Sequence, residues 1–183
     1  MIYLIDNRAA DMLICAIGQG DMSALETLYS ELAPAVCAFA RSIVKDEAAA
    51  QDVMQDTFVR VYNSAGAFSP CGLGCAWVMQ IARNLSFNAL SRFAKSEPEE
   101  TISESPAADS TEDFAEARVM IMHALDGLSD AERQVITLHA VSGLKLDAVA
   151  RVMNEPLGTI KWRHSQAMKK IRAAMSAGEE AAR

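Results

Sequence analysis

The strongest constraint on the fold lies between residues 143 and 172, where two apolar stripes of helical period are separated by a turn. The first stripe follows the i, i+3, i+4, i+7 spacing: Leu146, Val149, Ala150 and Met153. Asn154 tolerates the left-handed conformation that ends a helix, and Pro156 suits the first turn of the next one. The second stripe consists of Leu157, Ile160, Ala167, Met168 and Ile171. The spacing predicts a helix-turn-helix.

The second of these helices is basic. Residues 142 to 172 contain seven Lys and Arg against two acids, a local net charge of +5 in a chain whose formal total is −7. A helix-turn-helix with a basic second helix is built to enter the major groove of DNA. The alternative is a helical hairpin whose basic face is merely solvated.

Composition narrows the fold class. A chain of 183 residues holds one large or two small domains, and its many Ala, Leu and Met residues with few β-branched alternations favour an all-α fold. No apolar run approaches the roughly 20 residues of a membrane span, and the opening MIYLI is too short for a signal peptide. We therefore expect a cytoplasmic protein without membrane insertion, whose four cysteines are thiols.

The first 95 residues predict a bundle of helices. A short helix at 9 to 17 precedes one opened by a Ser23–Glu26 capping box, and Pro34 predicts a kink or break near Ala33. A third helix covers residues 47 to 63. One of its faces carries an acidic and amide strip, which is either a partner surface or an ordinary solvated face: Gln51, Asp52, Gln55 and Asp56.

A glycine-rich loop at 64 to 75 leads into a helix whose surface is polar, basic and aromatic. Trp77 is expected in the core of the bundle. The other face carries Arg83, Asn84, Phe87, Asn88, Arg92 and Lys95. Such rings, amides and arginines suit unstacked bases, which stack on aromatic rings and hydrogen-bond to amides.

The composition changes between residues 96 and 117, where eight acids and two prolines occur without Lys or Arg. Such a segment cannot bury enough apolar surface to order itself, so it predicts a flexible acidic linker between two domains. The expected organisation is 1–95, linker 96–117, second domain 118–176 and polar tail 177–183. Within the second domain a helix covers 118 to 125, and Ser129 with Glu132 predicts a capping box at the next helix.

Four segments in this order resemble the extracytoplasmic-function (ECF) sigma factors, the small two-domain initiation subunits of bacterial RNA polymerase. They are GQGDMSALETLY, DVMQDTFVRVY, AWVMQIARNL and LSDAERQVITLHAVSGLKLDAVARVMNEPLGTIKWR. The resemblance covers about residues 10 to 95 and 118 to 172. It implies a sigma region 2 and a sigma region 4, an RNA polymerase core and promoter DNA as partners, and control by an anti-sigma factor.

The resemblance also assigns roles to residues. Asp52, Gln55 and Asp56 would dock on the β′ clamp helices of the polymerase, and the second domain would bind the β flap. The loop after Phe68 would capture a base flipped from the minus-ten element, which Asn84 would read with Asn88 and Arg92 nearby. The last helix would enter the minus-thirty-five element, with these residues facing DNA: Lys161, Trp162, Arg163, Ser165, Gln166 and Lys169.

Four departures from the family pattern leave the promoter sequence open. Trp162 stands where a small polar residue is usual, Gln166 where arginine is frequent, and His164 at a usually apolar position. Ser69-Pro70-Cys71 replaces the usual Arg-Gly after the phenylalanine. A pH-sensing role for His164 is one interpretation, and a partly buried side chain is the other.

Other kinds of site find little support in the sequence. Cys71 and Cys75 have C-x3-C spacing, but no nearby His completes a zinc site, so we expect incidental thiols; oxidation of the pair that stiffens the loop is the alternative hypothesis. No phosphate-binding loop or activated nucleophile is present. The sequence therefore predicts no catalytic residue, metal or cofactor. An autonomous transcription regulator is the rival class, although the first 95 residues show no strand alternation.

Overall fold

The computed structural model describes residues 5–93 and 127–181, with the side chains at 93 and 177–181 left out. All regular secondary structure in these two ranges is helical, as the sequence predicts, and no strand occurs in them. The predicted linker at 96–117 and the predicted helix at 118–125 lie outside the described residues.

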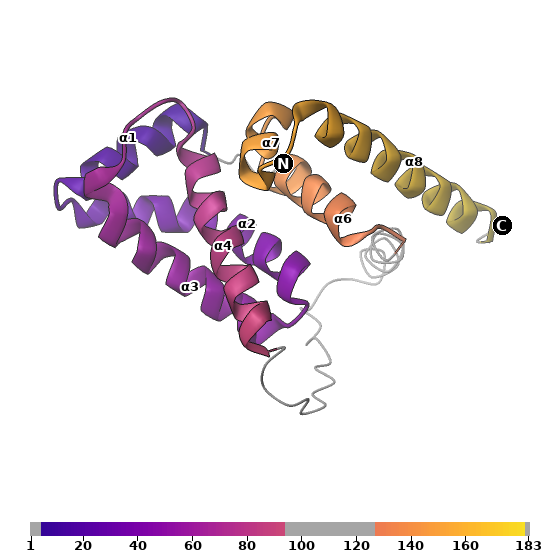
Figure 1. The fold of residues 1–183 in the computed structure, drawn as a ribbon, viewed down its shortest axis with the longest axis horizontal. Coiled ribbons are helices and arrows are strands. Elements are labelled where there is room, and N and C mark those ends of the chain that lie inside the picture. The colour runs from indigo at the N-terminus through magenta and orange to yellow at the C-terminus, as the bar shows by residue number, and fades with distance from the viewer. Residues whose placement is uncertain (1–4, 94–126, 182–183) are drawn as a thin grey trace.

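Four α-helices form the first group: α1 (Asn7–Gly18), α2 (Met22–Val44), α3 (Glu47–Ser64) and α4 (Gly74–Phe93), with the short 3₁₀ helix η1 (Ala65–Ala67) after α3. They pack as a bundle in which α2 contacts each of the other three α-helices (Figure 1). Aspartates begin the first three helices because each carboxylate accepts the free N–H groups of a first turn. These caps are Asp6, Asp21 and Asp46.

The capping box predicted for α2 is wrong, and of the kink or break predicted at Pro34 the break is absent. Asp21, not Ser23, caps this helix: its carboxylate accepts the N–H groups of Ser23 and Ala24 at 2.9 and 3.2 Å, so Ser23 already lies inside the helix. The helix also continues through Pro34 without a break. Pro34 is exposed while Ala33 and Ala35 on either side are buried. Packing of the flanking residues therefore outweighs the roughly 3 kcal/mol cost of an internal proline.

The second group contains α6 (Asp130–Ile136), the π-helical segment η2 (Thr137–Val141), α7 (Leu146–Met153) and α8 (Leu157–Ala181). Asn154 has φ 54° and ends α7 in the left-handed conformation, which confirms the predicted turn. The helix α8 reaches Ala181 and so extends into the segment 177–183, which the sequence predicts to be a polar tail.

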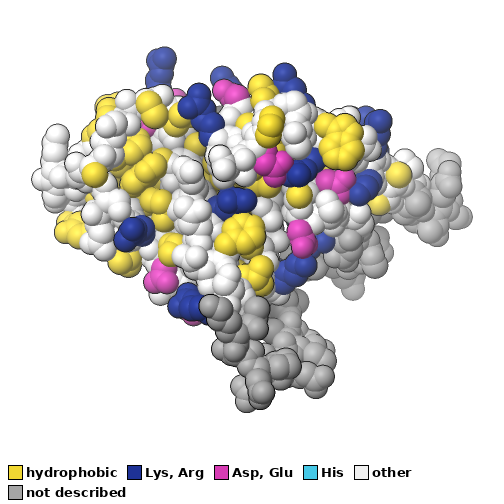
Figure 2. Space-filling view, in the orientation of Figure 1, with side chains coloured by type: hydrophobic (Ala, Val, Ile, Leu, Met, Phe, Trp, Pro, Cys, Tyr) yellow, Lys and Arg dark blue, Asp and Glu magenta, His cyan; other side chains and the backbone are white. Residues whose placement is uncertain are grey.

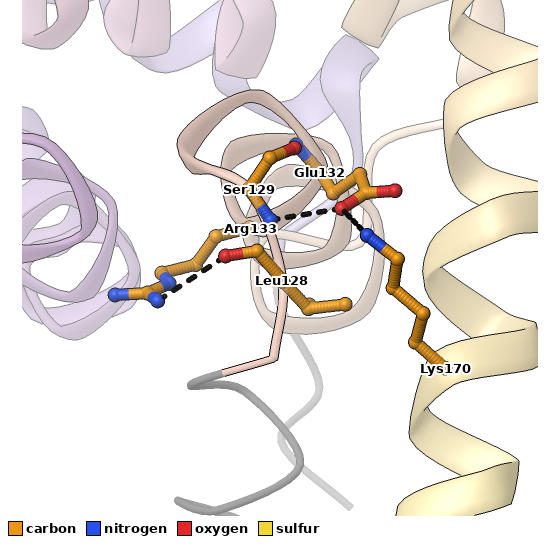
Figure 3. A network of polar contacts seen from close by, with 5 residues as sticks. All are labelled: Leu128, Ser129, Glu132, Arg133 and Lys170. Carbon is orange, nitrogen blue, oxygen red and sulfur yellow. Dashed lines mark hydrogen bonds and ion pairs between the residues drawn. The ribbon is translucent and has the colours of Figure 1, made fainter.

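A polar network joins α6 to α8 (Figure 3). The backbone N–H of Ser129 donates to Glu132 at 2.8 Å and the Ser129 hydroxyl accepts from the Glu132 N–H at 3.3 Å, which confirms the predicted capping box. Lys170 donates to the same carboxylate oxygen at 2.7 Å. This lysine contact, more than the capping hydrogen bonds, lowers the pKa of Glu132 below its usual 4.5. The Glu132 carboxylate therefore links the first turn of α6 to α8.

The two groups pack against each other, which the sequence did not predict. α2 contacts α6 and η2, and α4 contacts α7. Within the described residues, a continuous cluster of buried apolar side chains includes Met79 from α4 together with Leu138 and Leu144 from the second group. The Ser142 hydroxyl lies 3.9 Å from the Met79 sulfur across this junction. A well-exposed ion pair between Lys45 and Asp130 adds little, so burial of apolar surface holds the groups together.

Candidate nucleic-acid and protein interfaces

The N-terminal half of α8 presents an exposed face of the helix-turn-helix. Ile160 and Ala167 are fully buried against the rest of the second group, whereas Leu157, placed on the same stripe by the sequence, is 37 % exposed in the first turn. α8 packs on α6 and α7 and lies on the side of the second group away from α1–α4 (Figure 1). Figure 2 shows Lys and Arg side chains gathered over this half of the molecule, with apolar side chains among them. The face is open to a ligand.

The six residues expected to face DNA divide into two sets. Four are exposed: Lys161, Trp162, Ser165 and Lys169. The other two, Arg163 and Gln166, are half-buried. Arg163 donates to the Glu155 carboxylate at 2.6 Å and so ties α8 to the turn that precedes it. This ion pair, which the sequence did not reveal, makes Arg163 a positioning residue of the turn in this structure.

His164 faces the second group instead of solvent. Its ring meets the edge of the His139 ring with centroids 4.9 Å apart, and Nδ1 of His139 lies 2.8 Å from the Leu144 carbonyl oxygen. A carbonyl can only accept, so this nitrogen carries the proton. Burial, and to a smaller extent the neighbouring His139, lowers the pKa of His164 below 6.5. Of the two interpretations of this residue, the structure shows the partly buried side chain.

Mild acid is expected to destabilise the protein through His164. The unfolded residue binds its proton near pH 6.5 and the folded residue only at lower pH, so the unfolded chain holds more protons in that interval. Stability is full above 6.5 and falls as the pH drops toward the folded pKa, by at most about 1.4 kcal/mol per pH unit. Urea unfolding on both sides of this interval should show a smaller loss for His164→Leu than for the unaltered chain. Equal losses of stability in His164→Leu and the unaltered chain would contradict this account. Glu132 does not obscure the comparison, because its pKa lies below the usual 4.5.

The exposed face of α4 carries the predicted base-reading side chains. Asn84 and Asn88 lie one turn apart and both are exposed, as is Arg92. The Arg83 guanidinium carbon lies 4.7 Å from the centroid of the Phe87 ring, which is 37 % exposed. A guanidinium stacked on a ring beside two amides is a surface on which an unpaired base can stack and form hydrogen bonds.

The loop before α4 is fixed to α1 by two residues that sequence reasoning missed. The Asp11 carboxylate accepts the N–H of Gly72 at 2.5 Å, and the Asn7 side-chain oxygen accepts that of Cys75 at 3.1 Å. Gly74 admits no Cβ, which would lie 2.6 Å from the Asp11 nitrogen. Sequence patterns contain no signal for such long-range anchors beyond the glycines themselves. The loop conformation is therefore determined by α1.

Phe68 and Trp77 flank this loop. Their rings pack with centroids 4.9 Å apart, and both residues lie against the main core cluster. Trp77 is half-buried and packs against the core, the side on which the sequence places it. Phe68 is half-buried in this contact, so the exposed residues of the loop are those that follow it: Ser69, Pro70 and Cys71.

The two loop cysteines lie in different environments. Cys71 is exposed, whereas Cys75 is 2 % exposed and its thiol contacts the Ile5 carbonyl oxygen at 3.4 Å. Burial, followed by the nearby Asp6 and Asp11 carboxylates, raises the pKa of Cys75 to about 12. Cys75 therefore supplies almost no thiolate at neutral pH, which disfavours the redox hypothesis. Within residues 5–93 and 127–181, no group of three or more His, Cys, Asp and Glu side chains is placed to hold a metal ion.

An apolar groove lies beside the acidic and amide strip of α3. Asp52, Gln55 and Asp56 are exposed, and Gln55 also lines a groove of about 610 Å³ between α2 and α3. Its other lining residues are Met22, Leu25, Glu26, Tyr29, Phe58, Val59 and Tyr62. Val59 and Tyr62 are 59 % and 47 % exposed. They lie off the buried stripe of α3. Large apolar residues outside that stripe are a weak sequence signal for a groove, and only the structure shows that they are exposed.

No helix in the described ranges is both long and apolar enough to span a bilayer. An all-helical protein with an exposed basic helix in a helix-turn-helix, and a second surface of amides and stacked rings, is a DNA-binding protein of the helix-turn-helix class. Comparison with known families specifies it further. The sigma-70 region 2 family matches residues 28–95 and the sigma-70 region 4 family matches residues 124–173.

Similar proteins agree with these matches. The chain is 28% identical to the RNA polymerase sigma factor CarQ of Myxococcus xanthus over 84% of this chain and 90% of CarQ. It is 30% identical to the ECF RNA polymerase sigma factor EcfG of Rhodopseudomonas palustris, over 78% and 80%. The sigma factor RpoE of Bartonella quintana, solved with the anti-sigma factor NepR, superposes with a TM-score of 0.65 at 26% identity, over 82% of this chain and 96% of RpoE. The chain belongs to the sigma-70 family and is an ECF sigma factor, which directs RNA polymerase to promoters.

Proposed function

We propose that the two helical groups share promoter recognition. The exposed face of α8 enters the major groove of the minus-thirty-five element, where Lys161 and Lys169 attract phosphates and Trp162, Ser165 and Gln166 face bases. The single observation that carries this assignment is the exposed basic face of α8, a helix that packs on α6 and α7. Arg163 supports the same helix through Glu155 in the turn.

The first group would read and open the minus-ten element. Asn84 and Asn88 are exposed beside the Arg83–Phe87 stack, and the Ser69–Cys71 loop is held rigid at its base by Asp11. A flipped base costs a few kcal/mol of unstacking, which a rigid loop with a stacking surface can offset. The domain bounds that fit these roles are 1–95 and 118–176.

The polymerase would bind the α2–α3 groove. Three exposed residues of the acidic and amide strip lie beside this apolar groove: Asp52, Gln55 and Asp56. Acidic side chains next to an apolar groove fit an amphipathic helix with basic flanks. The β′ clamp helices are the proposed occupant, and the second group would bind the β flap. Phosphodiester chemistry belongs to the polymerase in this proposal, and the chain, acting in the cytoplasm, supplies no catalytic residue or cofactor.

The packed arrangement differs from the promoter-bound one. The two elements lie roughly 25 base pairs apart, which is about 85 Å along B-DNA. A compact chain of this length has a radius of gyration of only about 16 Å. The two groups must therefore separate before both elements can be bound at once. An anti-sigma partner, such as the one bound to RpoE of Bartonella quintana, would act by stabilising the packed arrangement.

Replacing Asn84 tests the proposed minus-ten contact. In run-off transcription from a genomic library with core polymerase, Asn84→Ala is expected to change the preferred minus-ten sequence, because a lost bidentate base contact costs about 1–3 kcal/mol of discrimination. The matched control is Asn63→Ala, an exposed asparagine at the end of α3. Identical start-site preferences for Asn84→Ala and the unaltered chain would remove Asn84 from the site.

A further inference from the structure

Trp162 has no visible role in stabilising the fold. Its side chain is 60 % exposed, the largest exposed fraction of any aromatic residue in the described ranges. Among the described residues it takes part in no aromatic stack, cation–π contact or side-chain hydrogen bond. The exposed ring is therefore available to a ligand, on a helix that also exposes basic side chains.

The position of Trp162 on α8 is that of a base-reading residue. It is the sixth residue of a helix that begins at Leu157, and the N-terminal residues of a recognition helix are those that reach base edges. Ser165 and Lys169 follow on the same stripe at i+3 and i+7 and are exposed. Arg163, the neighbouring long side chain, is held by Glu155 at the turn. The indole is thus the bulkiest group that this stripe offers to the groove.

The chemistry of an indole selects among the four bases. Its ring is apolar and its single polar group, Nε1–H, can only donate. Thymine presents a C5-methyl group next to an O4 acceptor, which matches both features. Guanine presents acceptors without a methyl group, cytosine presents a donor, and adenine pairs its acceptor with a donor. Thymine is therefore the base whose major-groove edge fits Trp162 best.

We propose that Trp162 is a specificity-determining residue of α8 that selects a thymine in the minus-thirty-five element through its C5-methyl group. This inference rests on the proposed function of α8 and adds to it the base that is recognised. Neither the basic residues nor Ser165 supplies a comparable apolar surface on this stripe.

Deoxyuridine tests the proposal because it differs from thymidine only by the C5-methyl group. Each thymine of the minus-thirty-five element, on either strand, is replaced in turn in a promoter obtained by run-off selection, and binding of the reconstituted holoenzyme is measured. At one or two positions the replacement is expected to weaken binding by about fourfold, the effect of one buried methyl group. With Trp162→Ala, binding should be weaker and equal for thymine and uracil at those positions. Trp162→Phe should retain part of the discrimination.

Lys169→Ala is the matched control. Loss of a phosphate contact should weaken binding to both DNAs alike and reduce its salt dependence, with thymine still preferred over uracil. Indifference of the unaltered holoenzyme to uracil at every position, or unchanged discrimination in Trp162→Ala, would overturn the proposal while leaving promoter binding by α8 intact. Absence of any dependence on the minus-thirty-five element would overturn the function proposed for α8 as well.

Discussion

A cross-link between Lys45→Cys and Asp130→Cys is expected to abolish promoter-dependent transcription. The Lys45 ammonium and the Asp130 carboxylate lie 3.0 Å apart across the junction of the two helical groups, and both side chains are well exposed, so a short reducible cross-linker that reacts with two thiols can join cysteines at these positions. Cross-linked groups cannot bind DNA elements about 85 Å apart. Run-off transcription by the cross-linked protein with core polymerase should fall to background, and reductive cleavage of the linker should restore it.

The cross-linking experiment needs a background without Cys71, the exposed native thiol, and Cys71→Ser provides it. Lys45→Cys alone in this background is the matched control, since it carries one of the two substitutions but cannot be bridged. It should transcribe equally with and without the cross-linking reagent. Full activity of the cross-linked protein would show that the packed arrangement is compatible with initiation.

A charge in the α2–α3 groove is expected to weaken binding to core polymerase by at least about 30-fold. Val59 is 59 % exposed in the free protein, so Val59→Lys leaves the helical core intact while placing an ammonium group against an apolar floor. Buried central residues of an interface often contribute 2 kcal/mol or more, and about 2 kcal/mol corresponds to this factor. Titration of labelled sigma factor with core polymerase measures the loss.

Met12→Lys is the matched control for the groove. Met12 is 74 % exposed on α1 and does not line the groove, so the same new charge there should leave polymerase affinity within about twofold. Thermal unfolding of both variants separates binding from folding. Equal polymerase affinities for Val59→Lys and Met12→Lys would place the polymerase surface elsewhere.

Local sequence signals predicted much of the helical framework. The Ser129–Glu132 capping box and the left-handed Asn154 are both present because each depends on residues within one helical turn. The packing of Trp77 against the core followed from the apolar period of α4. Short-range rules failed where two signals competed, as at Asp21 and Ser23, or where flanking packing offset a proline, as at Pro34.

Long-range features were not predictable from the chain alone. Leu138 and Leu144 contribute to a cluster that also contains residues of the first group, but an apolar stripe does not reveal which partner buries it. The Arg163–Glu155 ion pair and the Asp11 anchor of Gly72 depend on the path of the backbone between elements. The groove at Val59 and Tyr62 required knowledge of which residues the fold leaves uncovered.

The separation of the two helical groups on a promoter is the most direct test of the whole account. Energy transfer between dyes at Lys45→Cys and Asp130→Cys, whose exposed side chains pair at 3.0 Å across the junction of the two groups, reports this separation in the full chain. Transfer should be efficient in the free protein, where the groups share a core, and should collapse in the complex with core polymerase and promoter DNA. Efficient transfer in the promoter complex would contradict the account, because packed groups cannot occupy both elements.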